Sequence, residues 1–150
     1  MHGDAPPALD DLGLAAALDV LAQSQGALTE VPIVVDTDEE VAGVLLSLAV
    51  ELVLYRTAQE AITNALRHAC PTSIRISLRL QAGMAQLVVI DDGTGFKVPD
   101  RFDSLAAQGH LGLVGLDQRV RQAGGQLTVF SILGLGTTLQ VDLPLQPVSP

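Results

Sequence analysis

Four side chains that could take part in chemistry fall on one arc of a predicted helix. The stretch ELVLYRTAQEAITNALRHAC, residues 51–70, places Glu60, Asn64, Arg67 and His68 one, three or four positions apart. Positions four apart lie within about 40° of each other around an α-helix. A carboxylate, a carboxamide, a guanidinium and an imidazole thus share one side, where they could accept protons, hold a cation or bind an anion. An ordinary solvated helix face would carry similar residues, so other segments must decide between a functional site and a plain helix surface.

The opposite side of this helix is apolar and predicts burial. Pro71 directly follows the stretch and should end the helix. The apolar residues recur at the three- and four-residue steps of a buried stripe, namely Leu54, Ala58, Ala61, Ile62, Ala65, Leu66 and Ala69.

A first glycine-containing segment, DDGTGF at residues 91–96, leaves a predicted strand as a loop. Gly93 and Gly95 would let the backbone pass close to a ligand. Asp91, at the strand end, can accept a hydrogen bond from an amine such as the exocyclic amine of adenine. A tight turn without any ligand would explain the same glycines.

A second glycine-containing segment, GHLGLVG at residues 109–115, precedes a predicted helix. Free backbone N–H groups at Gly109, Gly112 and Gly115 could face a phosphate chain there. The segment does not follow a strand as a dinucleotide-binding fingerprint does, and the chain has no GxxxxGK[ST] phosphate loop. A turn without a ligand again remains the alternative.

The remaining elements predict a two-layer α+β sandwich. Helices are expected over 12–23 and 51–70, and a third follows the segment 109–115 and runs through Val120. Strands are expected over 31–35, 73–80, 86–90, 127–132 and 138–143. Asp10 and Asp11 could cap the first helix, and Gly26 could end it. Most connections are hairpin-like, so we expect a mixed, mainly antiparallel sheet of about five strands with about three helices on one face. The segment 98–108 has no regular pattern and is interpreted as a mobile connection.

The composition narrows the class of protein and of partner. A chain of 150 residues with 48% apolar and 17% charged residues is an ordered globular domain, expected over 9–146 between tails at 1–8 and 147–150. The formal net charge of −9 argues against a nucleic-acid partner. Cys70 is the only cysteine, which excludes an internal disulfide and fits a reducing, cytoplasmic location. The apolar stretch 41–54 is shorter than the roughly 20 residues that cross a bilayer, and is expected in the core.

Four motifs together resemble a known family. EAITNALRHA, DDGTGF, GHLGLVGLDQRV and GLGTTLQVDLPL follow one another between residues 60 and 145. Their sequence and order resemble the Bergerat-type ATP-binding domain of bacterial sensor histidine kinases, over about residues 49–145. Within that family the chain looks most like the nitrate- and redox-responsive sensors. PALDDLGLAAAL, residues 7–18, resembles the segment that joins the family's dimerisation helices to the ATPase domain.

The resemblance implies a role for each polar residue of the long helix. Asn64 would be the Mg²⁺ ligand, a task that suits an amide oxygen. Glu60 would orient or deprotonate the incoming nucleophile, directly or through water. Arg67 and His68 would approach the phosphates of ATP.

The glycine-containing motifs receive roles in the same way. Asp91 would bind adenine, with Thr137 as its partner in a water network and Thr138 as a weaker candidate. The wall of the adenine pocket would be formed by Gly93 and Gly95, and the lid and phosphate cradle by Gly109, His110, Leu111, Gly112, Leu113 and Gly115. Asp92 departs from the asparagine common in the family, and we expect it to point away from the phosphates. The stretch 43–50 is more apolar than is usual, and no clear phenylalanine box is present between the glycine motifs.

The resemblance further implies transfer of the γ-phosphoryl group of Mg-ATP to a histidine on a dimerisation domain, and then to a response regulator. None of the three histidines suits the acceptor, since His2 is in the tail and the others lie inside the motifs. This chain alone is expected to be a monomer. An anti-sigma-factor-type serine kinase of the same fold, or a partner-interaction domain without catalysis, would carry similar motifs and stay open as alternatives.

Overall fold

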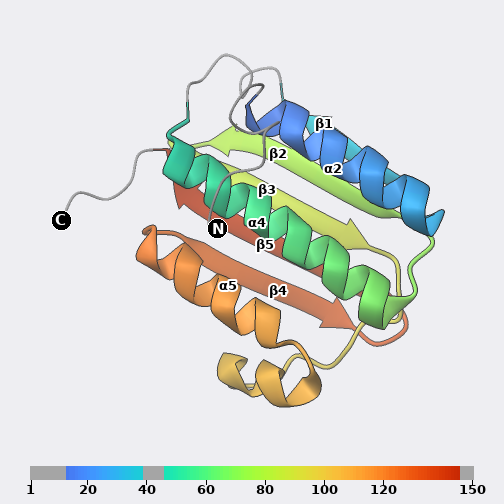
Figure 1. Cartoon of the computed structure of the whole chain (residues 1–150). Coiled ribbons are helices and arrows are strands. Elements are labelled where there is room, and N and C mark those ends of the chain that lie inside the picture. The colour runs from blue at the N-terminus through green and yellow to red at the C-terminus, as the bar shows by residue number, and fades with distance from the viewer. Residues whose placement is uncertain (1–12, 39–45, 146–150) are drawn as a thin grey trace, which may run out of the picture.

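The computed structural model describes residues 13–38 and 46–145, which form a five-stranded sheet covered by helices. The strand order is β1-β2-β3-β5-β4, with β1 (Ile33–Thr37) parallel to β2 (Ile74–Gln81). The other neighbours, among β2, β3 (Met84–Asp91), β5 (Gly136–Pro144) and β4 (Gln126–Ile132), are antiparallel. Helices α2 (Leu14–Thr29), α4 (Leu48–Asn64) and α5 (Leu111–Gln122) lie side by side on one face of the sheet (Figure 1). The predicted α+β sandwich is confirmed.

Strict alternation along the strands sets which residues meet the helices. In β2, Ile74, Ile76 and Leu78 are buried while Arg75 between them is exposed. The hairpin from β2 to β3 turns at Ala82 and Gly83, which both have positive φ. Two positive φ values in a two-residue loop match the twist of antiparallel strands.

Helix α4 supplies the centre of the core, and its predicted apolar stripe is confirmed with one exception. Leu54 and Ala58 are fully buried against the sheet, whereas Leu66 is only half-buried. The stripe pattern missed Thr57, which is also buried. Its hydroxyl donates to the Val53 carbonyl (2.8 Å), so burial leaves no polar atom unpaired.

The first helix differs from its prediction at both ends. Gly26 does not end it; α2 continues to Thr29 and stops at Glu30, which adopts a left-handed conformation. One glycine inside a helix costs only about 1 kcal/mol. At its start, the Leu14 N–H donates to the Glu51 carboxylate of α4 (3.2 Å), while Asp10 and Asp11 lie outside the described residues.

Two short helices also depart from the predictions. The long helix is not α-helical throughout, because its last turn, η1 (Ala65–Ala69), is a π-helix. The segment interpreted as a mobile connection contains a 3₁₀ helix, η2 (Phe102–Gln108), which buries Leu105 completely. A single buried leucine in a helix of seven residues leaves no periodic signal, so the pattern could not show this helix. Within the described residues, no helix is long and apolar enough to cross a membrane.

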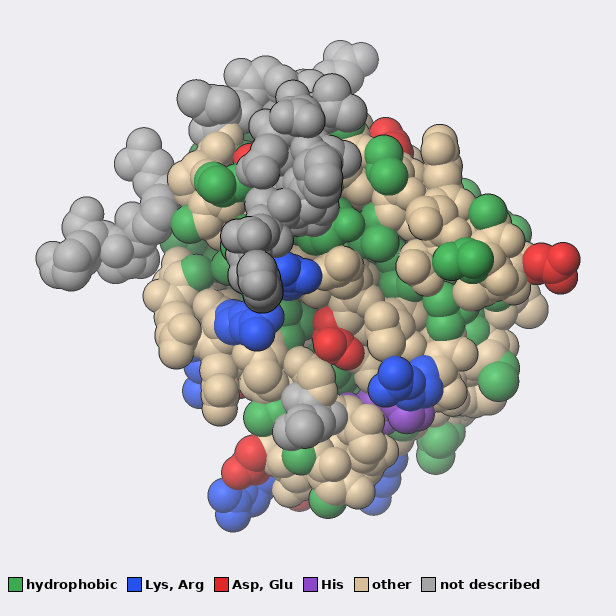
Figure 2. All heavy atoms as spheres, in the orientation of Figure 1, with side chains coloured by type: hydrophobic (Ala, Val, Ile, Leu, Met, Phe, Trp, Pro, Cys, Tyr) green, Lys and Arg blue, Asp and Glu red, His purple; other side chains and the backbone are tan. Residues whose placement is uncertain are grey.

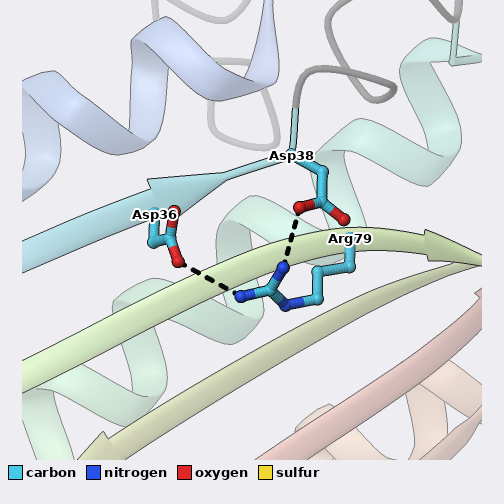
Figure 3. A network of polar contacts seen from close by, with 3 residues as sticks. All are labelled: Asp36, Asp38 and Arg79. Carbon is cyan, nitrogen blue, oxygen red and sulfur yellow. Dashed lines mark hydrogen bonds and ion pairs between the residues drawn. The ribbon is translucent and has the colours of Figure 1, made fainter.

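Parallel edge strand β1 is joined to β2 by an ion-pair network on the open face of the sheet (Figure 3). Arg79 of β2 contacts Asp36 (3.1 Å) and Asp38 (2.7 Å) with different nitrogens of one guanidinium. All three side chains are partly exposed, so the pairs contribute modestly to stability and mainly fix the register of β1.

The loop after β3 is fastened to the start of β2 by Asp92. Its carboxylate accepts hydrogen bonds from the Thr72 hydroxyl and from the N–H groups of Thr72 (2.7 Å) and Ser73 (3.0 Å). These donors, the Thr72 hydroxyl first, lower the pKa of Asp92 to about 2.

The Asp92 carboxylate should therefore stabilise the fold above about pH 4 and lose this effect toward about pH 2. The pKa of Asp92 is lower in the folded chain than the ordinary 3.8, so the folded state binds fewer protons than the unfolded state. The free energy of unfolding therefore decreases as the pH falls. We expect Asp92→Asn to be less stable than the wild type near neutral pH, by a margin that shrinks as the pH falls. Thermal denaturation across this range checks it, with the exposed Asp100→Asn as the control. A margin independent of pH would contradict the assignment.

Two glycines of α5 give a matched test of how this helix packs on α4. A Cβ added at Gly112 would clash with the Glu60 carboxyl group, whereas a Cβ at Gly115 would meet nothing. Gly115→Ala should raise the free energy of unfolding by about 0.5–1 kcal/mol, because alanine loses less entropy in a helix. Gly112→Ala should give less or none of this gain, since Glu60 must move. Chemical denaturation measures both, and equal gains would show that Gly112 and Glu60 are not in close contact.

Candidate functional site

A small cavity lies between the C-terminal end of α4 and the sheet. Its volume is about 100 Å³. Polar groups reach it from three elements: Asn64 from α4, His68 from η1, and Asp91 and Thr137 from the sheet. The other lining residues are Ala61, Ala65, Ala69, Val89, Gly95, Phe96, His110, Leu113 and Leu139. A mostly apolar hollow with a few convergent polar groups is typical of a small-molecule site, although ligand pockets usually reach about 300 Å³ or more. A ligand of nucleotide size must therefore widen it.

Three neighbouring strands each end their helix-facing row with a polar residue. In the register of the sheet, Asp91 of β3 is paired with Thr137 of β5, which is paired with Ser131 of β4. Other helix-facing residues on these strands, farther from this end of the sheet, are apolar and buried, such as Val89, Leu139 and Leu127. Polarity thus appears where the sheet meets the cavity.

Asp91 is a buried carboxylate with backbone partners. Only 8% of the residue is exposed, and its Oδ1 accepts the Gly93 N–H (2.9 Å). Burial raises the pKa of Asp91, while the backbone N–H groups of Gly93 and Thr137 act in the opposite direction. A carboxylate held in this way can accept a hydrogen bond from an amine inside the cavity.

The amide of Asn64 is oriented by Glu60, one turn earlier. Its Nδ2 donates to both the Glu60 carbonyl (2.8 Å) and the Glu60 Oε2 (2.8 Å). With both N–H groups used, Oδ1 is the atom that remains to bind a ligand. An amide oxygen suits a hard cation such as Mg²⁺, which usually takes one or two protein ligands together with phosphates and water. In keeping with that pattern, the described residues contain no cluster of three His, Cys, Asp or Glu side chains for an all-protein metal site.

His110 closes one side of the cavity. Its Nδ1 lies 3.1 Å from the Asn64 Oδ1, so it donates there as the Nδ1–H tautomer. The ring stacks on Phe96, with centroids 4.4 Å apart, and lies 4.7 Å from the ring of His68. Burial, and secondarily the charge of His68, lowers the pKa of His110, which favours the neutral ring. A cation at Asn64 would have to displace this contact.

A second, larger hollow of about 1180 Å³ lies on the helical face of the molecule and begins at Glu60. It runs between α2, α4 and α5, and its charged residues are Arg56, Glu60 and Arg119. Figure 2 shows this face, with an acidic side chain among basic ones between the helices. Glu60 therefore borders the open groove while its partner Asn64 lines the enclosed cavity.

The structure brings most, but not all, of the predicted residues together. Arg67 is exposed and lines neither hollow. Thr138 points to the open face of the sheet, so Thr137 is the threonine that reaches the cavity. Asp92 is directed toward Thr72 and away from the cavity, as expected.

The glycines of the two motifs mainly allow close packing of the backbone and do not form one open loop. Gly93 has no room for a Cβ beside Ala69, and Gly95, with φ of 66°, packs against the Ile132 carbonyl. Gly109 has a positive φ just before α5, whereas Leu111, Gly112, Leu113 and Gly115 are already within that helix. Only the first turn of α5, and not Gly115, therefore offers free N–H groups to an anion.

Ser131 was not among the residues predicted for the site, although a polar residue at its position in the strand is unusual. Its hydroxyl oxygen accepts the Phe96 N–H (2.8 Å) and lies 2.8 Å from the Thr137 Oγ1. In the strand that contains Leu127 and Val129, position 131 is also helix-facing, yet it holds a serine. A polar residue at an inward position of a strand is the feature that could have identified it.

Comparison with known proteins agrees with this geometry. Residues 49–147 match the model of the histidine kinase-, DNA gyrase B- and HSP90-like ATPase family. A sensor-like histidine kinase of Chloroflexus aurantiacus is 36% identical over 69% of this chain and 17% of its own length. The histidine-protein kinase/phosphatase DegS of Bacillus subtilis is 32% identical over 93% of this chain and 36% of its own length. The nitrate- and redox-responsive subfamily is not confirmed and stays an expectation.

The fold is shared with a solved kinase domain. The histidine kinase domain of the blue-light activated kinase EL346 of Erythrobacter litoralis superposes with a TM-score of 0.67 and 28% identity, over 88% of this chain and 61% of that one. The chain spans about a third or less of the length of the curated relatives described above. On the strength of the family match over residues 49–147, this chain belongs to the histidine kinase-, DNA gyrase B- and HSP90-like ATPase family.

Proposed function

We propose that this chain is the ATP-binding catalytic domain of a sensor histidine kinase. It would supply the γ-phosphoryl group of Mg-ATP to a histidine on a dimerisation domain, for relay to a response regulator. The observation that carries the proposal is the convergence of Asn64 with Asp91 and Thr137 on one cavity, with Glu60 hydrogen-bonded to Asn64 at its border. The relatives support a histidine kinase over an anti-sigma-factor-type serine kinase, since they are named sensor histidine kinases.

The base of the nucleotide is assigned to the sheet side of the cavity. Asp91 is buried beside Thr137, so its carboxylate has lost hydrogen bonds to water. An adenine amine that donates to this carboxylate would replace one of them. Phe96 supplies an aromatic surface in the same cavity. The phosphates would extend past His68 toward the N-terminus of α5, where free N–H groups attract an anion.

The metal ion is assigned to Asn64. Its Oδ1 would hold Mg²⁺, and the bound ion would supply neutralisation of the phosphate charge that develops during transfer. Glu60 fixes which atom of the amide faces the cavity, because it occupies the Nδ2 group on the other side. Phosphoryl transfer depends mainly on such positioning and on charge stabilisation.

Glu60 is also assigned to the acceptor. Its carboxylate borders the open groove and can orient or deprotonate an incoming imidazole, directly or through water. The acceptor is assigned to another domain, since His68 and His110 line the cavity itself. The acceptor would approach through the groove, which has Arg56 and Arg119 on its walls.

Partners and location follow from this assignment. The partners would be the dimerisation domain of the parent protein and a response regulator, and the isolated chain would be a monomer. We place the domain in the cytoplasm, where ATP is supplied and a free Cys70 stays reduced.

Asp91→Asn should weaken ATP binding by about 10- to 100-fold, because a charged acceptor is replaced by a group that is partly a donor. The fold should persist, since an amide oxygen can still accept the Gly93 N–H. Titration calorimetry with Mg-ATP measures the effect, and Asp100→Asn is the matched control on an exposed loop. Unchanged affinity in the Asp91 variant would refute the adenine assignment.

Asn64→Ala should abolish the dependence of ATP binding on Mg²⁺. In the wild type, chelating Mg²⁺ should weaken binding, because Asn64 and the phosphates share the ion. In the variant, the affinities with and without Mg²⁺ should converge. Thr63→Ala, an exposed neighbour on the same helix, is the control. If the Asn64 variant keeps the Mg²⁺ dependence, the ligand lies elsewhere.

A further inference from the structure

We propose that Ser131 is a positioning residue of the adenine site, which acts by holding the Thr137 hydroxyl and the Phe96 backbone beside Asp91. The inference rests on the nucleotide site proposed above and adds to it a determinant of base specificity. Ser131 does not line the cavity itself.

The contacts of Ser131 join β4 to two other segments, the loop after β3 and strand β5. Its Oγ accepts the Phe96 N–H (2.8 Å) from the loop after β3. The same oxygen lies 2.8 Å from the Thr137 Oγ1 and 3.2 Å from the Gly136 carbonyl oxygen, both on β5. Each of these segments contributes a wall of the cavity, through Phe96 and Thr137.

The single hydroxyl proton of Ser131 determines whether Thr137 can donate a hydrogen bond into the cavity. Ser131 has one proton, which goes either to the Gly136 carbonyl or to the Thr137 Oγ1. If it goes to Thr137, the Thr137 proton is free to be donated into the cavity. If it goes to Gly136, Thr137 donates to Ser131 and offers the cavity only its lone pairs. Only the first arrangement leaves the Thr137 proton for the cavity, and it depends on the hydrogen bond that Ser131 donates to the Thr137 Oγ1.

The direction of the Thr137 hydroxyl matters because adenine and guanine present opposite groups on their Watson–Crick edges. Adenine offers a donor amine next to the acceptor N1, and guanine offers an acceptor oxygen next to the donor N1–H. Asp91 accepts from the amine, so the neighbouring Thr137 must provide a donor, directly or through water, to match adenine. A site whose polar groups are left unpaired by the wrong base rejects it strongly.

The contact with Phe96 fixes a second wall of the site. The Phe96 ring stacks on His110, and the Gly134 N–H donates to the Thr94 carbonyl (2.7 Å) near the same hairpin. Ser131 therefore connects the loop that carries Phe96 to the strand that carries Thr137.

The test measures binding of Mg-ATP and Mg-GTP to the whole chain by titration calorimetry. Ser131→Ala should weaken ATP by about 3- to 10-fold, the usual value of one hydrogen bond, and should lower the preference for ATP over GTP. Ser131→Thr keeps a hydroxyl in a strand that favours β-branched residues and should retain the wild-type preference. Thr128→Ala, on the open face of the same strand, is the control and should leave both affinities unchanged. An unaltered ATP preference in folded Ser131→Ala, or its loss in Ser131→Thr, would overturn the proposal.

A double-mutant cycle separates positioning from general stabilisation of the strand. If Ser131 acts through Thr137, Ser131→Ala should weaken ATP much less in a Thr137→Val background than in the wild type. Fully additive losses would show that Ser131 acts independently of Thr137. Wild-type protein that binds no ATP would instead refute the nucleotide site itself, a result distinct from either variant outcome.

Discussion

The cavity depends on how closely α4 approaches the sheet. The buried side of this helix carries Leu54 near its middle but Ala61, Ala65 and Ala69 toward and beyond its end. Large apolar side chains at these three positions would fill the space above the sheet. With alanines, the backbone lies near the strands and still leaves room for Asp91 and Thr137 to face a ligand. The short side chains also allow Gly93 to pack directly on Ala69, which fixes the loop that forms one wall.

Placing a carboxylate in this space has a cost that the backbone largely offsets. Asp91 loses most of its contact with water, which raises its pKa, but it accepts the Gly93 N–H and faces the Thr137 N–H. Asp92 next to it takes a different course, because it turns outward to the exposed Thr72 and Ser73. Two adjacent aspartates thus differ in role: one is buried for recognition, and the other holds the loop in place.

Much of the fold could be predicted because alternation and helical periodicity are physical consequences of a one-sided core. The strand over 73–80 and the apolar stripe of α4 followed directly from them. The π-helical turn at 65–69 could not be predicted, since it changes a hydrogen-bond step without changing the residue pattern. The predicted end of α2 was wrong because Gly26 lies within the helix, which continues to Thr29. The position of Ser131 in the site could not be predicted without the strand pairing, because only the register shows that it lies beside Thr137.

The same hydrogen bond that orients Asn64 connects the two hollows of the molecule. Glu60 borders the groove on the helical face, Asn64 lines the cavity, and the Glu60 Oε2 accepts the Asn64 Nδ2 at 2.8 Å. Any group that draws Glu60 toward the groove must weaken this bond and leave the Asn64 amide held only by the Glu60 carbonyl and His110. Conversely, a cation held at the Asn64 Oδ1 keeps the Nδ2 directed at Glu60 and so keeps the carboxylate at the border. The two sides of a phosphoryl transfer would then be coupled through one turn of α4, without any movement of the sheet.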